Sequence, residues 1–208
     1  MNRTFAQIAG VMLCASAVLA QERATQMEVF VGYTFTRFSA ATDIPAFDAN
    51  GGSGQFVYNL NNWLGGVADL GAVHRGDIDD VHLDLTAATF LLGPRVAVRK
   101  WPRFTPFVQA LFGGVYGTSS SAVDLTAVTP GTVTIPAGAS LRAVRQQTAF
   151  AMTAGGGLDV KISRHVSLRP VQLEYLLTRL RNPITNDTNN QNNLRYGAGV
   201  NFTFGEPR

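Results

Sequence analysis

Alternation of side chains with a period of two residues runs through segment 103–117, RFTPFVQALFGGVYG. Val108 and Tyr116 fall on one face of this segment and Gln109 on the other, because successive strand side chains point to opposite faces. The three glycines of the segment disfavour a helix. The pattern therefore predicts a strand with one wholly apolar face, either in a soluble sandwich or in a barrel that faces lipid.

The same alternation recurs along the chain and predicts eight strands in all. The other seven segments are 27–38, 54–60, 64–73, 82–98, 148–162, 167–180 and 194–204. Segment 82–98 is the least regular, because the phase that Leu83 sets places Arg95 on the same side. A β-bulge near Gly93 and Pro94 is therefore predicted.

The connections between these segments alternate in length. Short turns are expected at 61–63, 98–103 and 163–165, and longer polar connections at 39–53, 75–81, 118–145 and 181–193. A soluble sandwich or a lipocalin-like barrel has no reason to keep the long connections at one end, whereas outer-membrane barrels have short periplasmic turns and long extracellular loops. The sequence thus predicts an all-β fold, a closed eight-stranded antiparallel up-and-down transmembrane β-barrel with both termini in the periplasm.

Composition is consistent with a membrane protein that lacks membrane helices. Of 208 residues, 46% are hydrophobic and 15% are charged, against about 25% charged in a typical soluble domain. No apolar run reaches the roughly 18 residues that a spanning helix needs. The formal net charge of +3 comes without a basic run, so nucleic acid is not an expected partner.

The first 20 residues have the pattern of a cleaved secretory signal peptide. Arg3 precedes an apolar stretch at 8–19, and the small Ala20 ends it. The mature barrel is then expected to span 21–208. The single cysteine, Cys14, lies within the signal, so the mature chain offers no disulfide and no thiol nucleophile.

The predicted barrel explains the polar residues inside otherwise apolar segments. A closed barrel satisfies its own backbone and tolerates lipid outside, while its interior accepts polar side chains that pair with one another. In a soluble core the same residues would be costly to bury. The expected polar network of the lumen comprises Asp69, Gln109, Asp159, Lys161, Gln172, Glu174 and Arg195.

Both rims of the expected barrel have residues typical of a membrane interface. Trp63 and Trp101 fall in short turns, where indoles favour the interface. The cations beside Trp101, which are expected to meet lipid phosphates, are Arg99, Lys100 and Arg103. On the opposite rim, Arg37 and Arg179 each end a lipid-facing series of apolar side chains. These two arginines are expected to contact lipopolysaccharide phosphates, the alternative being that they extend into water.

The chain resembles the small bacterial outer-membrane barrels related to the OmpA transmembrane domain and to OmpX. The resemblance rests on the export signal, the eight-strand pattern, the passage from GPRVAVR to TPFVQALFGG and the final YGAGVNFTF. It implies residence in the bacterial outer membrane, contact with outer-membrane lipids, and insertion by the barrel-assembly machinery. Phe204 is similar to the terminal aromatic that this machinery recognises, although GEPR follows it.

The resemblance specifies the architecture more than the activity. It implies a structural or surface-interaction role, namely envelope stability, adhesion or contact of the extracellular loops with an unknown ligand. We expect a monomer without catalysis, cofactor or bound metal. A lipid-A-modifying barrel enzyme and a small channel are the alternatives.

Two residue sets bear on those alternatives. His165, Ser167 and Glu174 are similar to the residue set of outer-membrane lipid A deacylases, but His165 falls in a turn on the periplasmic side and Glu174 faces the other way from the turn. The acidic loop 77–80 has oxygen ligands that a divalent cation accepts, and an ordinary solvated loop is the simpler interpretation.

Overall fold

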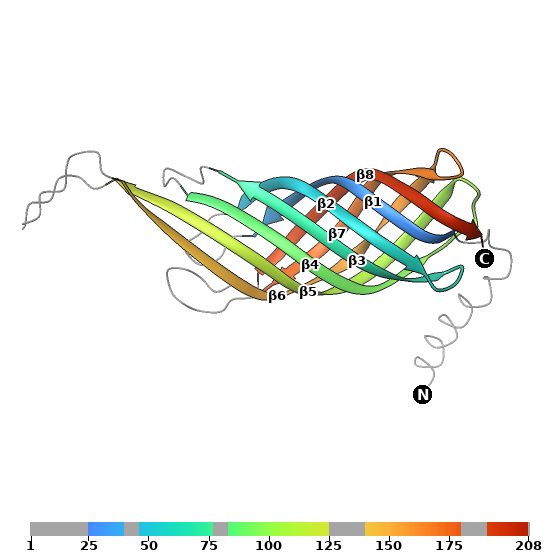
Figure 1. Ribbon diagram of the computed structural model, residues 1–208, viewed down its shortest axis with the longest axis horizontal. Coiled ribbons are helices and arrows are strands. Elements are labelled where there is room, and N and C mark those ends of the chain that lie inside the picture. Colours follow the sequence, from blue (N-terminus) through green and yellow to red (C-terminus); the bar gives the residue numbers. More distant parts are fainter. Residues whose placement is uncertain (1–24, 40–45, 77–82, 125–139, 180–190, 208) are drawn as a thin grey trace, which may run out of the picture.

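The computed structural model describes residues 25–39, 46–76, 83–124, 140–179 and 191–207. These residues form eight strands that close into a barrel (Figure 1). Each strand pairs antiparallel with the next, and β8 pairs antiparallel with β1. The predicted closed eight-stranded antiparallel barrel is confirmed. The strands are β1 (Thr25–Phe38), β2 (Phe47–Asn59), β3 (Leu64–Arg75), β4 (Leu83–Ala97), β5 (Phe104–Asp124), β6 (Ser140–Lys161), β7 (Val166–Thr178) and β8 (Gln191–Pro207).

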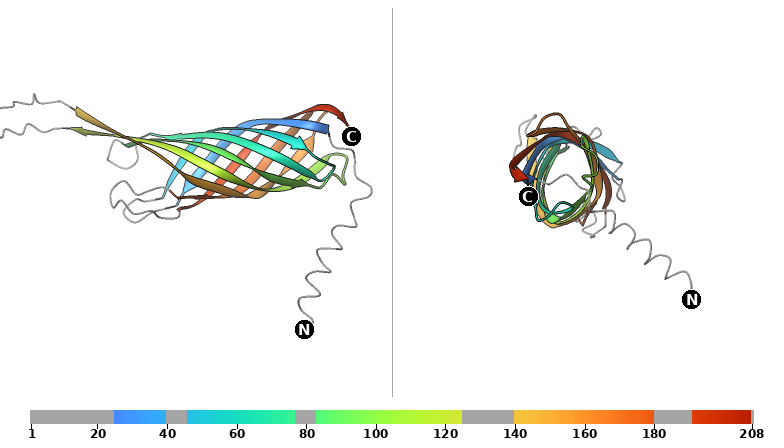
Figure 2. Two further views of the ribbon diagram at one scale, coloured as in Figure 1. Left: turned by 60° about the horizontal axis from the view of Figure 1, so that its bottom comes forward. Right: turned by 90° about the vertical axis from the view of Figure 1, so that its right-hand side faces the viewer.

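The two ends of the barrel differ. One end has the short turns 60–63, 98–103 and 162–165, together with the first residue of β1 and the last of β8 (Figures 1 and 2). The turns are closed by backbone hydrogen bonds, such as the 2.9 Å bond from Leu60 N to Leu64 O. We call this the short-turn end, and the opposite end, from which β5 and β6 project, the ribbon end.

β2 begins seven residues earlier than its sequence pattern predicts, at Phe47 rather than residue 54. The glycine-rich start of this strand has little strand preference of its own. It is held by neighbours on both sides, because β1 pairs with it up to Phe38 and β3 pairs with it from Asn50. Phe38 and Phe47 also stack, with ring centroids 4.9 Å apart.

The predicted bulge near Gly93 and Pro94 is wrong. The register of β4 on β5 is the same before and after these residues, with Leu92 opposite Phe112 and Arg95 opposite Gln109. The alternation of inward and outward side chains continues through Gly93 and Pro94, because the Arg95 side chain is buried inside the barrel. Register shifts occur instead between residues 158 and 160, between 169 and 172, and between 25 and 27.

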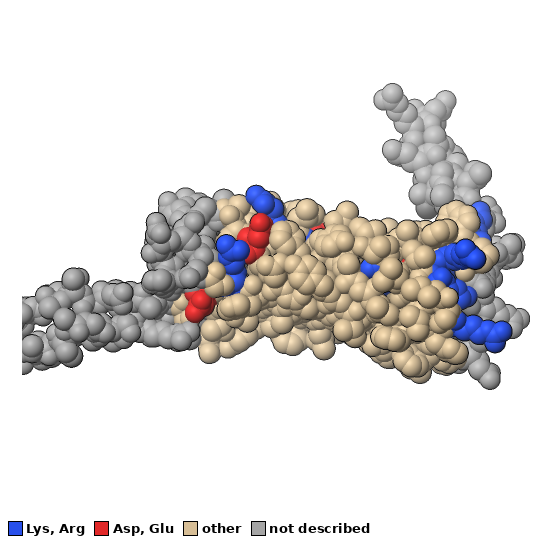
Figure 3. Space-filling model, turned by 90° about the horizontal axis from the view of Figure 1, so that it is seen from above, with Lys and Arg blue, Asp and Glu red and all other residues tan. Residues whose placement is uncertain are grey.

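The alternation gives the barrel two distinct surfaces. In segment 103–117, Val108 and Phe112 are exposed on the outside, whereas Gln109 and Leu111 are buried inside. Outward side chains of this kind cover the exterior with apolar groups, and few charges are visible along its middle (Figure 3). Such an exterior matches hydrocarbon rather than water.

Candidate functional site

The interior of the barrel contains most of the polar residues that the sequence singles out. Six of the seven expected lumen residues are 5% exposed or less, and Lys161 is the exception. Lys161 is exposed because it is the last residue of β6 and lies at the mouth of the barrel. The six buried residues are Asp69, Gln109, Asp159, Gln172, Glu174 and Arg195.

Sequence reasoning missed half of the charged interior. The structure also buries four further charged side chains, Glu28, Arg95, Arg99 and Arg169. Among the described residues, the buried charged groups are then four carboxylates and four guanidinium groups. The alternation of the strand already places Arg95 on the inner face. The sequence prediction of a bulge rests on not accepting an arginine there. Arg169 was harder to assign, because the register shift around Pro170 interrupts the strand beside it.

Near the short-turn end the network is centred on Glu28. Its carboxylate accepts hydrogen bonds from Asn59 Nδ2 at 2.8 Å, Arg99 Nη2 at 2.8 Å and Asn201 Nδ2 at 3.0 Å. Arg99 also donates to the backbone oxygen of Asn62 at 2.7 Å, in the neighbouring turn. Arg99, which the sequence placed beside Trp101 at the lipid interface, therefore points inward and closes the mouth of the barrel.

In the middle of the barrel, one carboxylate serves two arginines. Asp159 accepts from Arg95 Nη2 at 2.8 Å and from Arg169 at 2.6 Å (Nε) and 3.0 Å (Nη2). Arg169 Nη1 donates further to the side-chain oxygens of Gln55 at 2.7 Å and Gln172 at 2.8 Å. One carboxylate thus binds two buried cations at once, and the two amides add further partners for Arg169.

Aromatic rings complete the surroundings of these two arginines. The Arg95 guanidinium lies 3.5 Å from the ring centroid of Phe107, and the Arg169 guanidinium lies 4.4 Å from the same ring. Phe30 contacts Arg169 from another side at 4.2 Å. Because ring faces attract cations, these contacts stabilise the charges away from water.

Toward the ribbon end the network continues through Arg195. It binds Asp69 through two nitrogens, at 2.6 and 3.1 Å, and its Nε lies 2.9 Å from Glu174 Oε2. Glu174 also accepts a hydrogen bond from Gln109 Nε2 at 2.7 Å. Gln55 Nε2 donates to Asp69 at 2.8 Å, so the middle and outer parts form one connected network.

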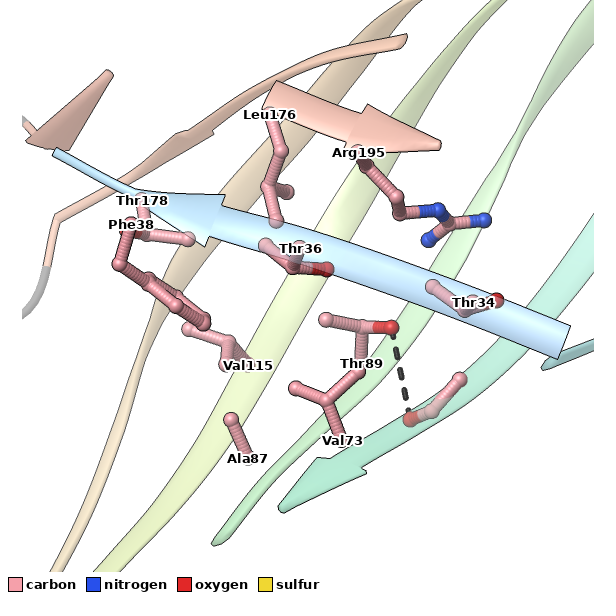
Figure 4. Close-up of a pocket in the computed structure, with 11 residues that line it drawn as sticks. Thr34, Thr36, Phe38, Val73, Ala87, Thr89, Val115, Leu176, Thr178 and Arg195 are labelled. Atoms are coloured by element: carbon pink, nitrogen blue, oxygen red, sulfur yellow. Dashed lines mark hydrogen bonds between the residues drawn. The ribbon is translucent and has the colours of Figure 1, made fainter. Parts of the chain in front are cut away.

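Beyond Arg195 the interior becomes largely apolar. A cavity of about 20 Å³ lies between Arg195, the threonines of β1 and apolar side chains such as Val115 and Leu176 (Figure 4). This volume holds one water molecule. Ala87, Val115 and Leu176 line this cavity and belong to an apolar cluster that also contains Val57, Val67, Leu91, Leu111 and Ala151. The cluster extends back toward the short-turn end, where Val57 lies opposite Glu28.

The packed interior leads to a prediction about conduction. Four ion-paired arginines and a cluster of apolar side chains lie inside the described part of the barrel, and eight strands enclose an interior only just wide enough for side chains. The purified monomer should therefore give no large, stable unitary conductance in planar bilayers. Reproducible openings of uniform size from the monomer would contradict this and favour the small-channel alternative.

The structure does not assemble the residues considered for lipid A deacylation. His165 is exposed in the turn before β7, whereas Ser167 is buried within the strand. The Glu174 carboxylate is bound by Gln109 and Arg195. The acidic loop 77–80 lies outside the described residues, and the rest of the described chain contains no group of three potential metal ligands.

The rim residues are exposed at the positions where the sequence placed them. Trp63 and Trp101 are 41% and 52% exposed in short turns. At the ribbon end, the Arg37 side chain is 60% exposed and makes one ionic contact, 3.4 Å from Asp48. Arg179 is also exposed, directly after β7.

An apolar exterior around a sealed, charge-paired interior defines a protein that crosses the outer membrane with strands. No helix among the described residues is long and apolar enough to span a membrane. The family model described as outer membrane protein beta-barrel domain matches residues 6–205, and the chain belongs to that family.

Solved structures of outer-membrane barrels share the fold at low sequence identity. Neisserial surface protein A has a TM-score of 0.60 and 14% identity, with 88% of this chain and all of that chain covered. The attachment invasion locus protein Ail of Yersinia pestis has a TM-score of 0.57 and 12% identity, with coverages of 87% and 99%. Ail has also been solved in complex with the heparin analogue sucrose octasulfate. No curated protein matches the chain.

Proposed function

We propose that this protein is an outer-membrane module for interactions at the cell surface. The projecting parts of β5 and β6, which we call the ribbon, bind an extended segment of an external partner. The unequal pairing of β6 supports this proposal. On one side β6 pairs with β5 as far as Ser140, whereas on the other side its pairing with β7 starts only at Ala151. Among the described strands, only β5 therefore pairs with residues 140–149.

An open edge of this kind can add a strand. Such an edge can form main-chain hydrogen bonds with an extended chain that aligns with it. The edge is about 30 Å long at ~3.3 Å per residue, enough for a peptide of eight to ten residues. Arg142 and Arg145 lie within it, and charges on an edge disfavour its pairing with a second copy of itself.

The proposal requires the ribbon end to face the outside of the cell and both termini to face the periplasm, after residues 1–20 have directed export. Trypsin added to intact cells should then cut at Arg142 or Arg145 in the ribbon. Lys100 and Arg103, in a short turn, should stay protected. Cleavage at Lys100 in intact cells would show the opposite orientation.

A shortened ribbon tests the binding itself. Thr118 lies opposite Gln146, so residues 119–145 can be replaced by Asn-Gly, a two-residue turn suited to joining paired strands. The probe is a labelled peptide that copies residues 114–124, which already pair with the other edge of β6. We expect binding to the intact protein and binding at least about tenfold weaker to the shortened variant, measured by fluorescence anisotropy.

Two controls separate loss of the edge from loss of the fold. The shortened variant should keep the gel mobility shift between unboiled and boiled samples that marks a folded barrel. A peptide of the same composition with two central prolines should not bind, because proline lacks the N–H that a strand must donate. Equal binding to the intact and shortened proteins would refute the proposed role of the ribbon.

The same proposal makes the barrel a monomer without catalytic activity, inserted by the barrel-assembly machinery. The separation of His165, Ser167 and Glu174 supports the absence of lipid A chemistry. Lipid A from cells with and without the protein should have the same mass spectrum.

A second proposed role is contact with lipopolysaccharide through Arg37 and Arg179. Both side chains are exposed at the ribbon end, and the single 3.4 Å contact of Arg37 with Asp48 leaves most of its guanidinium accessible. An exposed guanidinium binds phosphate through paired hydrogen bonds.

Changing Arg37 and Arg179 together to Gln should lower the amount of lipopolysaccharide that co-purifies with the folded barrel, measured as phosphate or fatty acid per mole of protein. The Asp48→Asn variant is a useful comparison, because it frees Arg37 and should increase binding or leave it unchanged. If the folded double variant retains as much lipopolysaccharide as the wild type, these arginines are not the site.

A further inference from the structure

At the short-turn end of the barrel, the side chains that the structure describes include exposed cations and no exposed carboxylate. Lys100, Arg103 and Arg164 are all exposed in the turns that follow β4 and β6. Figure 3 shows a group of blue side chains at this end, and blue and red side chains together toward the ribbon end. Among the acids whose side chains are described, Glu28 and Asp159 lie in this half of the barrel, and arginines inside the barrel bind both.

These cations lie in one sector of the rim. The turn 98–103 contains Lys100 and Arg103, and the adjacent turn 162–165 contains Arg164. The two turns are joined where Lys161 N donates a 2.8 Å hydrogen bond to Arg103 O. Arg99, by contrast, points into the barrel, so the sector differs from the cluster that the sequence alone indicated.

Large apolar side chains are exposed in the same sector. Trp101 is 52% exposed, Phe104 47% and Ile162 68%. Cations interleaved with aromatic and aliphatic groups match the boundary of a membrane, where rings lie among headgroups and cations meet phosphates. A cell-wall glycan would pair with the cations but leave these apolar side chains in water.

We propose that this sector binds the headgroups of anionic phospholipids, such as phosphatidylglycerol, in the leaflet that surrounds the short turns. The site is separate from the ribbon and from the lipopolysaccharide contacts at the opposite rim. The phosphates neutralise Lys100, Arg103 and Arg164, while Trp101 and Ile162 insert beside them. Binding of anionic phospholipid at this rim also holds the barrel at a fixed depth in its membrane.

Tryptophan fluorescence reports lipid contact at this end of the barrel, because both tryptophans of the chain lie in short turns. Trp101 lies within the sector, and Trp63 lies in turn 60–63. Brominated acyl chains quench tryptophan fluorescence on contact. The protein is reconstituted into phosphatidylcholine vesicles with a rising fraction of brominated phosphatidylglycerol or, in parallel, brominated phosphatidylcholine. The ratio of the two relative binding constants measures the preference for the anionic headgroup.

For the wild type we expect a ratio of about five or more at low salt, falling as salt is added. In the Lys100→Gln, Arg103→Gln, Arg164→Gln triple variant the ratio should fall to about one. The matched control, Lys100→Arg with Arg103→Lys and Arg164→Lys, keeps the charge and should keep the ratio. The gel mobility shift of unboiled samples verifies that each variant is folded.

Two results would overturn the proposal. The first is a wild-type ratio near one, or a ratio that the folded glutamine variant retains in full. The second is co-sedimentation of the wild type, but not of the glutamine variant, with purified peptidoglycan in the absence of any preference for phosphatidylglycerol. That result would assign the cations to the cell wall instead.

Discussion

Replacing Asp159 by Asn is expected to lower the free energy of unfolding by about 3–5 kcal/mol, the cost of leaving buried charge unpaired. Asp159 is the carboxylate shared by Arg95 and Arg169, which lie 2.8 and 2.6 Å from its oxygens. Both arginines are 2% exposed or less, so water cannot replace the lost charge. The measurement is urea unfolding in lipid vesicles, followed by the fraction of protein that keeps the mobility of the folded form.

Glu174→Gln is the matched comparison. This substitution removes the Glu174 carboxylate, one partner of Arg195. Asp69 still binds the same guanidinium through two contacts, at 2.6 and 3.1 Å. We therefore expect a smaller loss, about 1.5–3 kcal/mol, the range for one hydrogen bond to a charged group. If Asp159→Asn costs no more than Glu174→Gln, the shared carboxylate does not control the network as the distances suggest.

Replacing Gly113 by Ala is expected to destabilise the barrel by about 2–4 kcal/mol or to prevent folding. A Cβ at this position would overlap the carbonyl oxygen of Phe90 and lie 3.1 Å from Leu91 Cα, both on the paired strand β4. The overlap is with backbone, so no side-chain rotation relieves it. The strands would have to separate, with loss of the ladder between β4 and β5.

The neighbouring glycine supplies the control. A Cβ on Gly114 would meet only Ala149 O, at 3.5 Å, an ordinary contact. Gly114→Ala should therefore change stability by less than about 1 kcal/mol, in either direction. Urea unfolding of the two variants under the same conditions makes the comparison. Similar losses in both would mean that backbone freedom, rather than close strand approach, explains the glycines.

The fold could be predicted from the sequence because a barrel wall is a local pattern. Each strand shows its two environments through alternation, as Val108 and Gln109 do, and the turn lengths separate the two ends. The strand limits could not be predicted so well. The start of β2 and the ribbon of β5 and β6 are extended by pairing with neighbours, which a single segment does not reveal.

The interior could be predicted only in outline. Parity places Asp69 and Arg195 on the inner face, but it does not say that they meet across the lumen, because they are 126 residues apart in sequence. Lys161 has the correct parity and is still exposed, since parity does not show where the barrel ends. Arg95 was taken as an irregularity because a lone arginine among apolar residues resembles a break in the pattern.

The cross-lumen pairs also constrain how the barrel is assembled. Arg195 on β8 donates a hydrogen bond to Asp69 on β3. Asn201 on β8 donates one to Glu28 on β1, across the seam where the first and last strands meet. Until that seam closes, a partly formed sheet in the membrane holds charges whose partners have not arrived. Half-closed intermediates therefore have a higher free energy, because these unpaired charges face hydrocarbon. Insertion should proceed as one cooperative event, with closure of the seam and neutralisation of the interior occurring together.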